Sequence, residues 1–208
     1  MITKTRFNVE QSVRALKDIA CKQEYRDGYH LGLNSKDFEE YGLAMEREFG
    51  ELMYRYVLKK QPQTILELGT ANGYSSCWFL LGLLKNGKGN LITVDKFDRT
   101  PKIWDVLNIP THQMTAFIKL TKDFFKSFIG SLDMVLLDTE HRIEQIESDI
   151  NLIEPFLNEG ATLFIHDTFS DPDVGVKLKD FFMRKGTYDY ESIDKSCGLG
   201  IATYKGEN

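Results

Sequence analysis

Residues 64–76, with the sequence TILELGTANGYSS, contain the feature that most constrains the fold. An apolar run that ends at Leu68 meets Gly69, and after a short turn Gly73 opens a segment with a helix-like apolar pattern. A strand that turns directly into a helix needs positive φ angles, which glycine adopts easily, and bare backbone there lets a ligand approach closely. The stretch therefore predicts a strand, a glycine turn and a helix, with the turn as a ligand-binding loop.

The spacing of the two glycines excludes two common nucleotide-binding loops. Only Gly69 and Gly73 occur in the turn, so the three-glycine register of a dinucleotide fingerprint is absent, and no Gly-Lys-Ser/Thr closes a Walker loop. Glu67, near the end of the strand, suits a ligand with an ammonium group or hydroxyls better than one with phosphates. The ligand is therefore expected to be something other than a dinucleotide or a nucleoside triphosphate.

Length and charge narrow the class of protein further. The chain has 208 residues and 42% hydrophobic residues, which is enough for one large α/β domain with a sizeable core. The net charge of -5 argues against nucleic acid as the main partner, because affinity for phosphate backbones comes from clustered lysine and arginine. We expect a small-molecule substrate.

The cysteines and the apolar runs predict a cytoplasmic protein. Cys21, Cys77 and Cys197 are widely spaced and lack a CxxC pair, so neither a disulfide framework nor a zinc site is predicted. The first residues carry charges and lack the apolar core of a signal peptide. The longest apolar run, 77–84, is too short to span a bilayer, and we expect no membrane partner.

The rest of the chain predicts alternating helices and strands. Residues 1–34, a helix followed by a loop, are expected to be appended to a main domain over residues 35–208. The helical N-terminal third of the chain, which extends beyond residue 34, offers a surface for a homodimer. Periodicity predicts further helices from Ser35 to before Gln61, over 102–107, from Phe117 to Phe128, over 143–153 and over 174–185, and strands over 91–95, 111–117, 131–138, 160–167, 187–193 and 198–204.

Polar side chains follow several of these strands at the point where each strand ends. Asp95 ends the second strand, Asp138 ends the fourth, and His166 and Asp167 end the fifth. Neighbouring parallel strands lie about 4.8 Å apart, so the last three side chains should converge. Carboxylates with an imidazole can hold a divalent cation, with Mg²⁺ favoured by oxygen and Mn²⁺ admitted by the imidazole.

The motifs resemble a known family. ELGTANGYS resembles the first motif of class I S-adenosylmethionine-dependent methyltransferases, and its GYS ending is similar to the catechol-type O-methyltransferases. The LDTEH and FIHDTF segments resemble a broader branch that includes macrocin- and cephalosporin-type tailoring enzymes. The resemblance implies a doubly wound, seven-stranded, mostly parallel Rossmann-like sheet with the last strand antiparallel and helices on both faces. It also implies S-adenosyl-L-methionine as cofactor, contacted by Glu67, Gly69, Thr70, Ala71, Gly73, Ser75, Asp95 and Asp138.

The same resemblance implies roles for the residues after the fourth and fifth strands. The catechol-type enzymes bind magnesium through an aspartate and an adjacent pair, which match Asp138, His166 and Asp167. The family's usual Asp-Asn pair is His-Asp here, so a metal-dependent and a metal-independent enzyme both stay open. The family's lysine base, three residues after the first aspartate, is replaced by His141, whose ordinary pKa suits it to accept a hydroxyl proton.

The predicted function is methyl transfer from S-adenosylmethionine to a hydroxyl of a small molecule, with His141 and Asp138 as catalytic residues. Two alternatives remain open. One is a metal-independent methyltransferase acting on nitrogen or on a protein side chain, and the other is a module that binds the cofactor or a nucleotide without catalysis.

Overall fold

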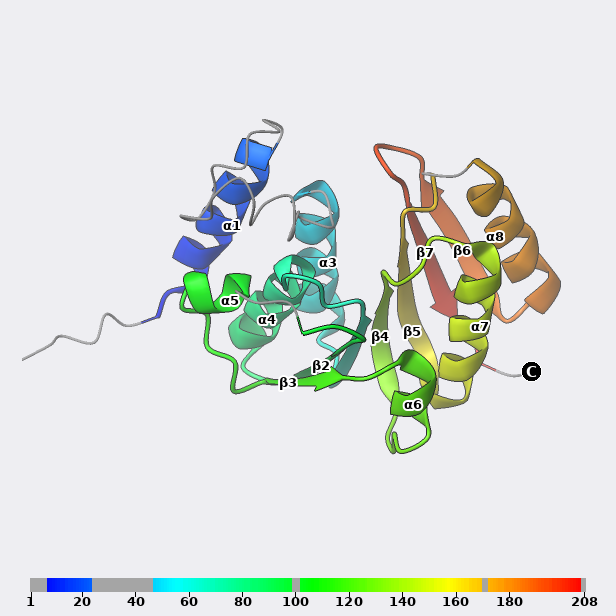
Figure 1. The fold of residues 1–208 in the computed structure, drawn as a ribbon, viewed down its shortest axis with the longest axis horizontal. Helices are drawn as coiled ribbons and strands as arrows, with labels where there is room; N and C mark the ends of the chain where they lie inside the picture. Colours follow the sequence, from blue (N-terminus) through cyan, green and yellow to red (C-terminus); the bar gives the residue numbers. More distant parts are fainter. Residues whose placement is uncertain (1–6, 24–46, 99–101, 170–171, 207–208) are drawn as a thin grey trace, which may run out of the picture. The chain divides into compact units, whose positions relative to one another are not determined.

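The computed structural model describes residues 7–23, 47–98, 102–169 and 172–206 (Figure 1). The chain forms two compact units, which are described separately. The first consists of residues 1–61, 71–88 and 99–114, and the second of residues 62–70, 89–98 and 115–208. The predicted division after residue 34 lies outside the described residues and stays a prediction.

The second unit is built on a seven-stranded sheet with the order β3-β2-β1-β4-β5-β7-β6. β1 pairs in parallel with β2 and β4, β4 pairs in parallel with β5, and β7 runs antiparallel to β5 and β6. This confirms the predicted mixed Rossmann-like sheet. The strands are β1 (Thr64–Leu68), β2 (Asn90–Asp95), β3 (Met114–Ile118), β4 (Leu132–Leu137), β5 (Leu157–His166), β6 (Tyr188–Ile193) and β7 (Leu199–Tyr204).

The register of β4 against β5 positions the candidate site. Leu137 pairs with Ile165, so Asp138 and His166 follow at the same edge of the sheet. The amide N–H of Asp138 donates to the carbonyl oxygen of Leu68 at 2.9 Å, which ties this point to the end of β1. The predicted neighbourhood of the fourth and fifth strands is confirmed.

Three helices cover one face of this sheet, and Figure 1 shows two of them, α7 and α8, beside the yellow-to-red strands. The inward side chains of α7 recur every three or four residues, as Ile143, Ile146, Ile150 and Ile153, and all four are buried as predicted. Residues of the other face, such as Ile65 and Phe164, are equally buried. The elements are α6 (Thr121–Phe125), α7 (Ile143–Ile153), the 3-10 helix η1 (Glu154–Phe156) and α8 (Pro172–Lys185).

The first unit is helical where it is described. Its helix α4 is apolar on every side and buried through most of its length, as expected of a helix with no solvent face. The side-chain amide of Asn86 donates to the carbonyl of Val57 at 2.8 Å, which joins α4 to α3. The part of the second predicted helix before residue 47 lies outside the described residues. The helices are α1 (Val9–Gln23), α3 (Arg47–Lys60), α4 (Tyr74–Asn86) and α5 (Ile103–Val106).

Three predicted elements differ in their bounds by three residues or more: β3 begins at Met114 instead of Thr111, β5 begins at Leu157 instead of Gly160, and one helix is much shorter than predicted. The helix expected from Phe117 to Phe128 is only five residues long, over 121–125, because β3 continues to Ile118. Phe117 packs from that strand against Phe124 with ring centroids 5.5 Å apart. The aromatic residues share one cluster, as helical spacing suggested, but they reach it from a strand and a short helix.

Among the described residues, no helix is both long enough and apolar enough to cross a membrane.

Candidate active site

The glycine turn after β1 is packed tightly against the end of β4. Gly69 has a φ of 102°, and a Cβ atom placed on it would lie 1.9 Å from the carbonyl oxygen of Asp138. Its amide N–H donates to the carbonyl oxygen of Val94, at 2.8 Å, on the other side. Because both its conformation and its space exclude a side chain, glycine is required here.

The remainder of the turn is also left-handed in part, as the sequence indicated. Ala71 and Gly73 have φ angles of 44° and 84°. A Cβ atom on Gly73 would lie 2.2 Å from the Trp104 ring, and the Lys102 ammonium donates to the carbonyl of Ala71 at 2.7 Å. Ser75, another predicted cofactor contact, is buried in the first turn of α4.

A row of buried polar side chains lies under the start of this turn. The carboxylate of Glu67 is fully buried and accepts a 2.5 Å hydrogen bond from the Thr93 hydroxyl. The hydroxyls of Thr93 and Thr70 are also 2.5 Å apart. A buried carboxylate needs such partners, so Thr93 holds Glu67 and is linked to the loop residue Thr70. A direct contact of Glu67 or Thr70 with a cofactor stays a prediction.

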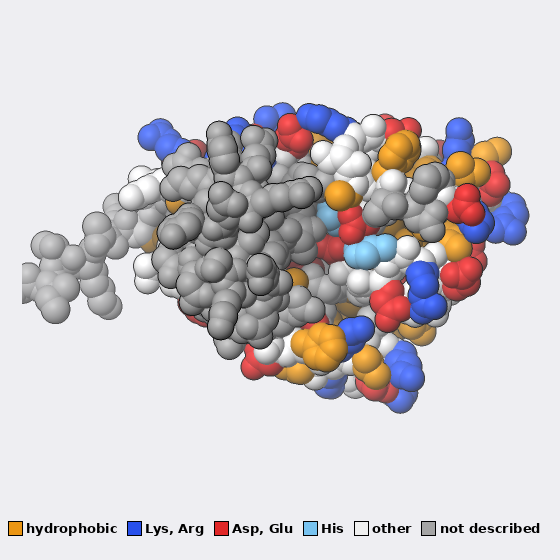
Figure 2. All heavy atoms as spheres, turned by 45° about the horizontal axis from the view of Figure 1, so that its top comes forward, with side chains coloured by type: hydrophobic (Ala, Val, Ile, Leu, Met, Phe, Trp, Pro, Cys, Tyr) orange, Lys and Arg blue, Asp and Glu red, His pale blue; other side chains and the backbone are white. Residues whose placement is uncertain are grey.

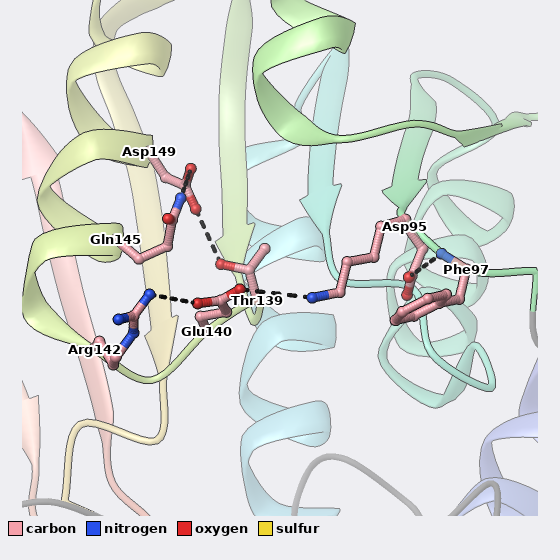
Figure 3. A network of polar contacts seen from close by, with 8 residues as sticks. Asp95, Phe97, Thr139, Glu140, Arg142, Gln145 and Asp149 are labelled. Carbon is pink, nitrogen blue, oxygen red and sulfur yellow. Dashed lines mark hydrogen bonds and ion pairs between the residues drawn. The ribbon is translucent and has the colours of Figure 1, made fainter.

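Asp95 ends β2 as predicted, and its carboxylate is oriented by the turn that follows. Its Oδ1 accepts a hydrogen bond from the amide N–H of Phe97 at 2.9 Å (Figure 3). The neighbouring Lys96 forms an ion pair with Glu140, with 3.6 Å between Nζ and Oε1. The loops after β2 and β4 are therefore linked at the surface.

Two aspartates and two histidines form a cluster after β4 and β5. His166 Nδ1 lies 3.2 Å from Asp138 Oδ1 and 3.6 Å from Asp167 Oδ1. His141 Nδ1 lies 3.0 Å from Asp167 Oδ2. The structure thus brings together all four residues that the sequence singled out, and Figure 2 shows histidine and acidic side chains side by side on one face.

The members of this cluster differ in exposure and in charge preference. The side chains of His166 and Asp138 are only 2% and 5% exposed, whereas that of His141 is 43% exposed. The hydrogen bond with Asp167, assisted by the charges of Asp167 and Asp138, raises the pKa of His141 above its ordinary value of 6.5. Burial favours a higher pKa for Asp167, but the hydrogen bond with His141 and the charges of both histidines outweigh it, so the pKa is lowered.

The donor set fits a divalent metal ion. Asp138, His141 and Asp167 can each offer one ligand atom, and these atoms lie within 4.8 Å of one another. The predicted set had His166 in place of His141. Two carboxylates and one imidazole suit Mn²⁺ or another transition metal better than Mg²⁺, which prefers oxygen ligands alone.

The glycine turn and the cluster both lie within a region that matches a known family. Residues 66–168 match the family model of a methyltransferase domain. This chain carries a methyltransferase domain. The match runs from Leu66 within β1 through Asp95 and Asp138 to Thr168, and it confirms the family that ELGTANGYS suggested.

Solved structures share this methyltransferase fold over nearly the whole chain. The O-methyltransferase TomG from Streptomyces achromogenes, involved in tomaymycin synthesis and solved in complex with SAM, is 20% identical, with 99% of this chain and 100% of that chain covered and a TM-score of 0.69. The methyltransferase PaMTH1 from Podospora anserina, solved with SAH bound, is 14% identical, with 99% and 100% covered and a TM-score of 0.67. An O-methyltransferase from Bacillus cereus in complex with SAH is 12% identical, with 98% and 94% covered and a TM-score of 0.66. No curated protein sequence matches the chain.

Sequence reasoning missed some residues that shape the methyltransferase site. Thr93 is one, although a threonine in the otherwise apolar strand LITVD is a signal that could have been used. Asp167 was selected from the sequence, but its backbone conformation was not, because a φ of 58° is unusual for a residue other than glycine. The amide N–H of the following Phe169 donates to the carbonyl of Cys197 at 2.7 Å, so the turn before β7 helps to hold this strained segment.

Proposed function

We propose that this methyltransferase transfers the methyl group of S-adenosylmethionine to a hydroxyl of a small-molecule acceptor. The observation that carries the proposal is the 3.0 Å pair of His141 and Asp167 beside Asp138, at the carboxyl ends of β4 and β5. Ligands of parallel sheets bind at this edge. The names of TomG and of the Bacillus cereus protein, both O-methyltransferases solved with SAM or SAH, support the same reaction.

His141 acts as the general base. Its Nδ1 faces the Asp167 carboxylate, so the tautomer with hydrogen on Nδ1 leaves Nε2 to take the proton from the acceptor hydroxyl. Asp167 then stabilises the imidazolium that forms. S-adenosylmethionine supplies an electrophilic methyl group, and the products are the methyl ether, S-adenosylhomocysteine and the proton held by His141.

The cofactor lies over the carboxyl ends of β1 and β2 in this proposal. Asp95 accepts hydrogen bonds from the ribose hydroxyls, and the bare backbone of Gly69 allows close approach. Glu67 sets the position of Thr70 through Thr93. The cofactor contacts predicted for Ala71, Gly73, Ser75 and Asp138 stay predictions.

A divalent metal ion would be held by Asp138, Asp167 and one of the two histidines. When bound, such an ion makes an acceptor hydroxyl more acidic and orients it. If His141 is a ligand, it does not serve as the base, so the two roles are alternatives. A cytoplasmic location, a homodimer and the lack of nucleic-acid and membrane partners also stay predictions.

Replacing His141 tests the proposal. The assay follows transfer of a labelled methyl group from S-adenosylmethionine to phenol, sugar and amine acceptors. We expect His141→Ala to lower kcat on the order of a hundredfold, because a positioned base contributes about that factor. The control is His112→Ala, which removes another exposed histidine and should leave the rate unchanged.

Other outcomes separate the alternatives. An unchanged rate in His141→Ala removes this residue from the mechanism. Transfer to amines alone supports the N-methyltransferase, and binding of S-adenosylhomocysteine without transfer to any acceptor supports the non-catalytic module.

A further inference from the structure

We propose that Asp149 is a positioning residue, whose buried carboxylate fixes the segment Asp138–Arg142, here called the base loop, through the hydroxyl of Thr139. The base loop carries Asp138 and His141, so this inference rests on the function proposed above.

The contacts of Asp149 point from helix α7 to the base loop. The Thr139 hydroxyl donates to Asp149 Oδ2 at 3.0 Å, and the side-chain amide of Gln145 donates to Oδ1 at 2.9 Å. Figure 3 shows Asp149 and Gln145 on α7, with Thr139 just beyond the end of β4. Both carboxylate oxygens are thus engaged, and one of them holds the base loop.

Burial of the Asp149 carboxylate is unfavourable. Its side chain is 1% exposed, and both donors described for it are neutral groups. Burial raises the pKa of this carboxyl, since desolvation disfavours the ionised form. An apolar residue at this position would avoid that cost, so stability alone does not account for the carboxylate.

Besides Thr139, the base loop has described ties at Asp138, Glu140 and His141, and His141 Nδ1 lies 3.0 Å from Asp167 Oδ2. Asp138 is held by its backbone N–H to Leu68. Glu140 pairs with Arg142 and Lys96, at 2.9 Å and 3.6 Å, but all three side chains are at least 45% exposed, where ion pairs contribute little. Thr139, between Asp138 and His141, therefore ties the loop to the buried carboxylate on α7.

Conservative substitutions can separate positioning from mere packing. A threonine hydroxyl both donates and accepts, so an amide at position 149 can donate to Thr139 while its oxygen accepts from Gln145. Asp149→Asn should therefore keep the loop in place, and so should Thr139→Ser. Asp149→Ala and Thr139→Val each remove the contact.

Asp133 provides a matched control at the other end of β4. Its Oδ2 accepts from the backbone N–H groups of Gln63 and Thr64, at 2.7 and 3.0 Å, and its Oδ1 accepts from Asn158 at 2.7 Å. Asp133→Ala breaks three hydrogen bonds of a carboxylate, against two in Asp149→Ala, at the opposite end of β4 from the base loop. It should lower the thermal midpoint and leave kcat unchanged.

The experiment measures kcat, the KM of the acceptor, the Kd of S-adenosylhomocysteine and the thermal midpoint of the full chain. We expect Asp149→Ala and Thr139→Val to lower kcat about tenfold to a hundredfold, since displacement of a catalytic group by about 1 Å has such effects. The Kd should change by less than about threefold, because the glycine turn is untouched, and Asp149→Asn and Thr139→Ser should stay within about threefold of the wild-type kcat.

Two results would overturn the inference. One is an unchanged kcat in Asp149→Ala, and the other is a loss of the same size in Asp133→Ala. The ring nitrogen resonances of His141, assigned by their loss in His141→Ala, give a readout without turnover: they should shift in Asp149→Ala and not in Asp149→Asn. If these resonances respond while the wild-type chain transfers no methyl group, the proposed function fails and the positioning role stands.

Discussion

At the scale of single residues, the carboxylates of this methyltransferase differ in the partners that surround them. Glu67 and Asp149 are buried carboxylates whose described partners are hydroxyl and amide groups. His141 and Asp167 instead favour the charged forms of each other. Burial raises the pKa of the Asp149 carboxyl, so ionisation of this group lowers stability.

Asp149 should therefore make stability fall as pH rises. Its folded-state pKa is raised above the ordinary 3.8, so the native state binds more protons than the unfolded state between the two pKa values. The contribution is fully present below pH 3.8 and is lost as pH rises through the folded pKa. In urea denaturation from about pH 4 to about pH 8, Asp149→Asn should gain stability relative to wild type and then level off. A stability difference between Asp149→Asn and wild type that is constant over this pH range would contradict the raised pKa of Asp149.

At the scale of elements, the turn at the end of β1 leaves little space for an added side chain. The turn approaches the carbonyl of Asp138 so closely that only glycine fits at position 69. The same contact joins Gly69 of the glycine turn to the residue that begins the base loop. A substitution in the turn should therefore perturb both ends of the site.

Gly69→Ala and Gly87→Ala distinguish two reasons for a glycine, the left-handed backbone and the lack of space for a side chain. Gly87, after α4, has a φ of 69° with nothing within 4 Å of an added Cβ, so alanine there meets only the left-handed backbone, at about 1–2 kcal/mol. Gly69→Ala adds a clash, and we expect a larger loss of stability and at least about a tenfold weaker binding of S-adenosylhomocysteine. Urea denaturation and calorimetric titration measure the two effects. Equal stability losses with unchanged affinity would show that the turn tolerates the side chain.

At the scale of the whole molecule, the order of the strands decides which residues meet. β1 lies between β2 and β4, and β5 lies beyond β4, so Gly69, Asp95 and the cluster of Asp138 and Asp167 belong to one edge of the sheet. In the proposed arrangement the cofactor lies over the ends of β1 and β2 and a metal ion over the ends of β4 and β5, so the two can be tested separately.

Calorimetric titration with S-adenosylhomocysteine, once with Mn²⁺ or Mg²⁺ and once with EDTA, makes that test. We expect binding at about micromolar Kd in both conditions, loss of methyl transfer in EDTA, and recovery when metal is returned, more fully with Mn²⁺ than with Mg²⁺ because of the imidazole ligand. Transfer that survives chelation would remove the metal and leave His141 as the base. Absence of binding in both conditions would remove the cofactor itself.

Local sequence patterns predicted much of the secondary structure of this chain. The strand, turn and helix at residues 64–76 were readable because glycine and apolar periodicity act within a few residues. The spacing of Ile143, Ile146, Ile150 and Ile153 predicted α7 for the same reason. The helix expected from Phe117 was wrong because an aromatic residue every three or four positions also occurs where a strand and a short helix feed one cluster.

The sequence by itself determined the strand ends and the residue types that stand there, which was enough to select Asp95, Asp138, His141, His166 and Asp167 and to suggest the methyltransferase family. Only the tertiary structure decided that His141 pairs with Asp167 and His166 with Asp138, that Thr93 holds Glu67, and that Asp149 holds Thr139. These partners are 10 to 28 residues apart in the chain. Contacts at that range depend on strand order, register and side-chain direction, which are properties of the packed sheet that no local pattern contains.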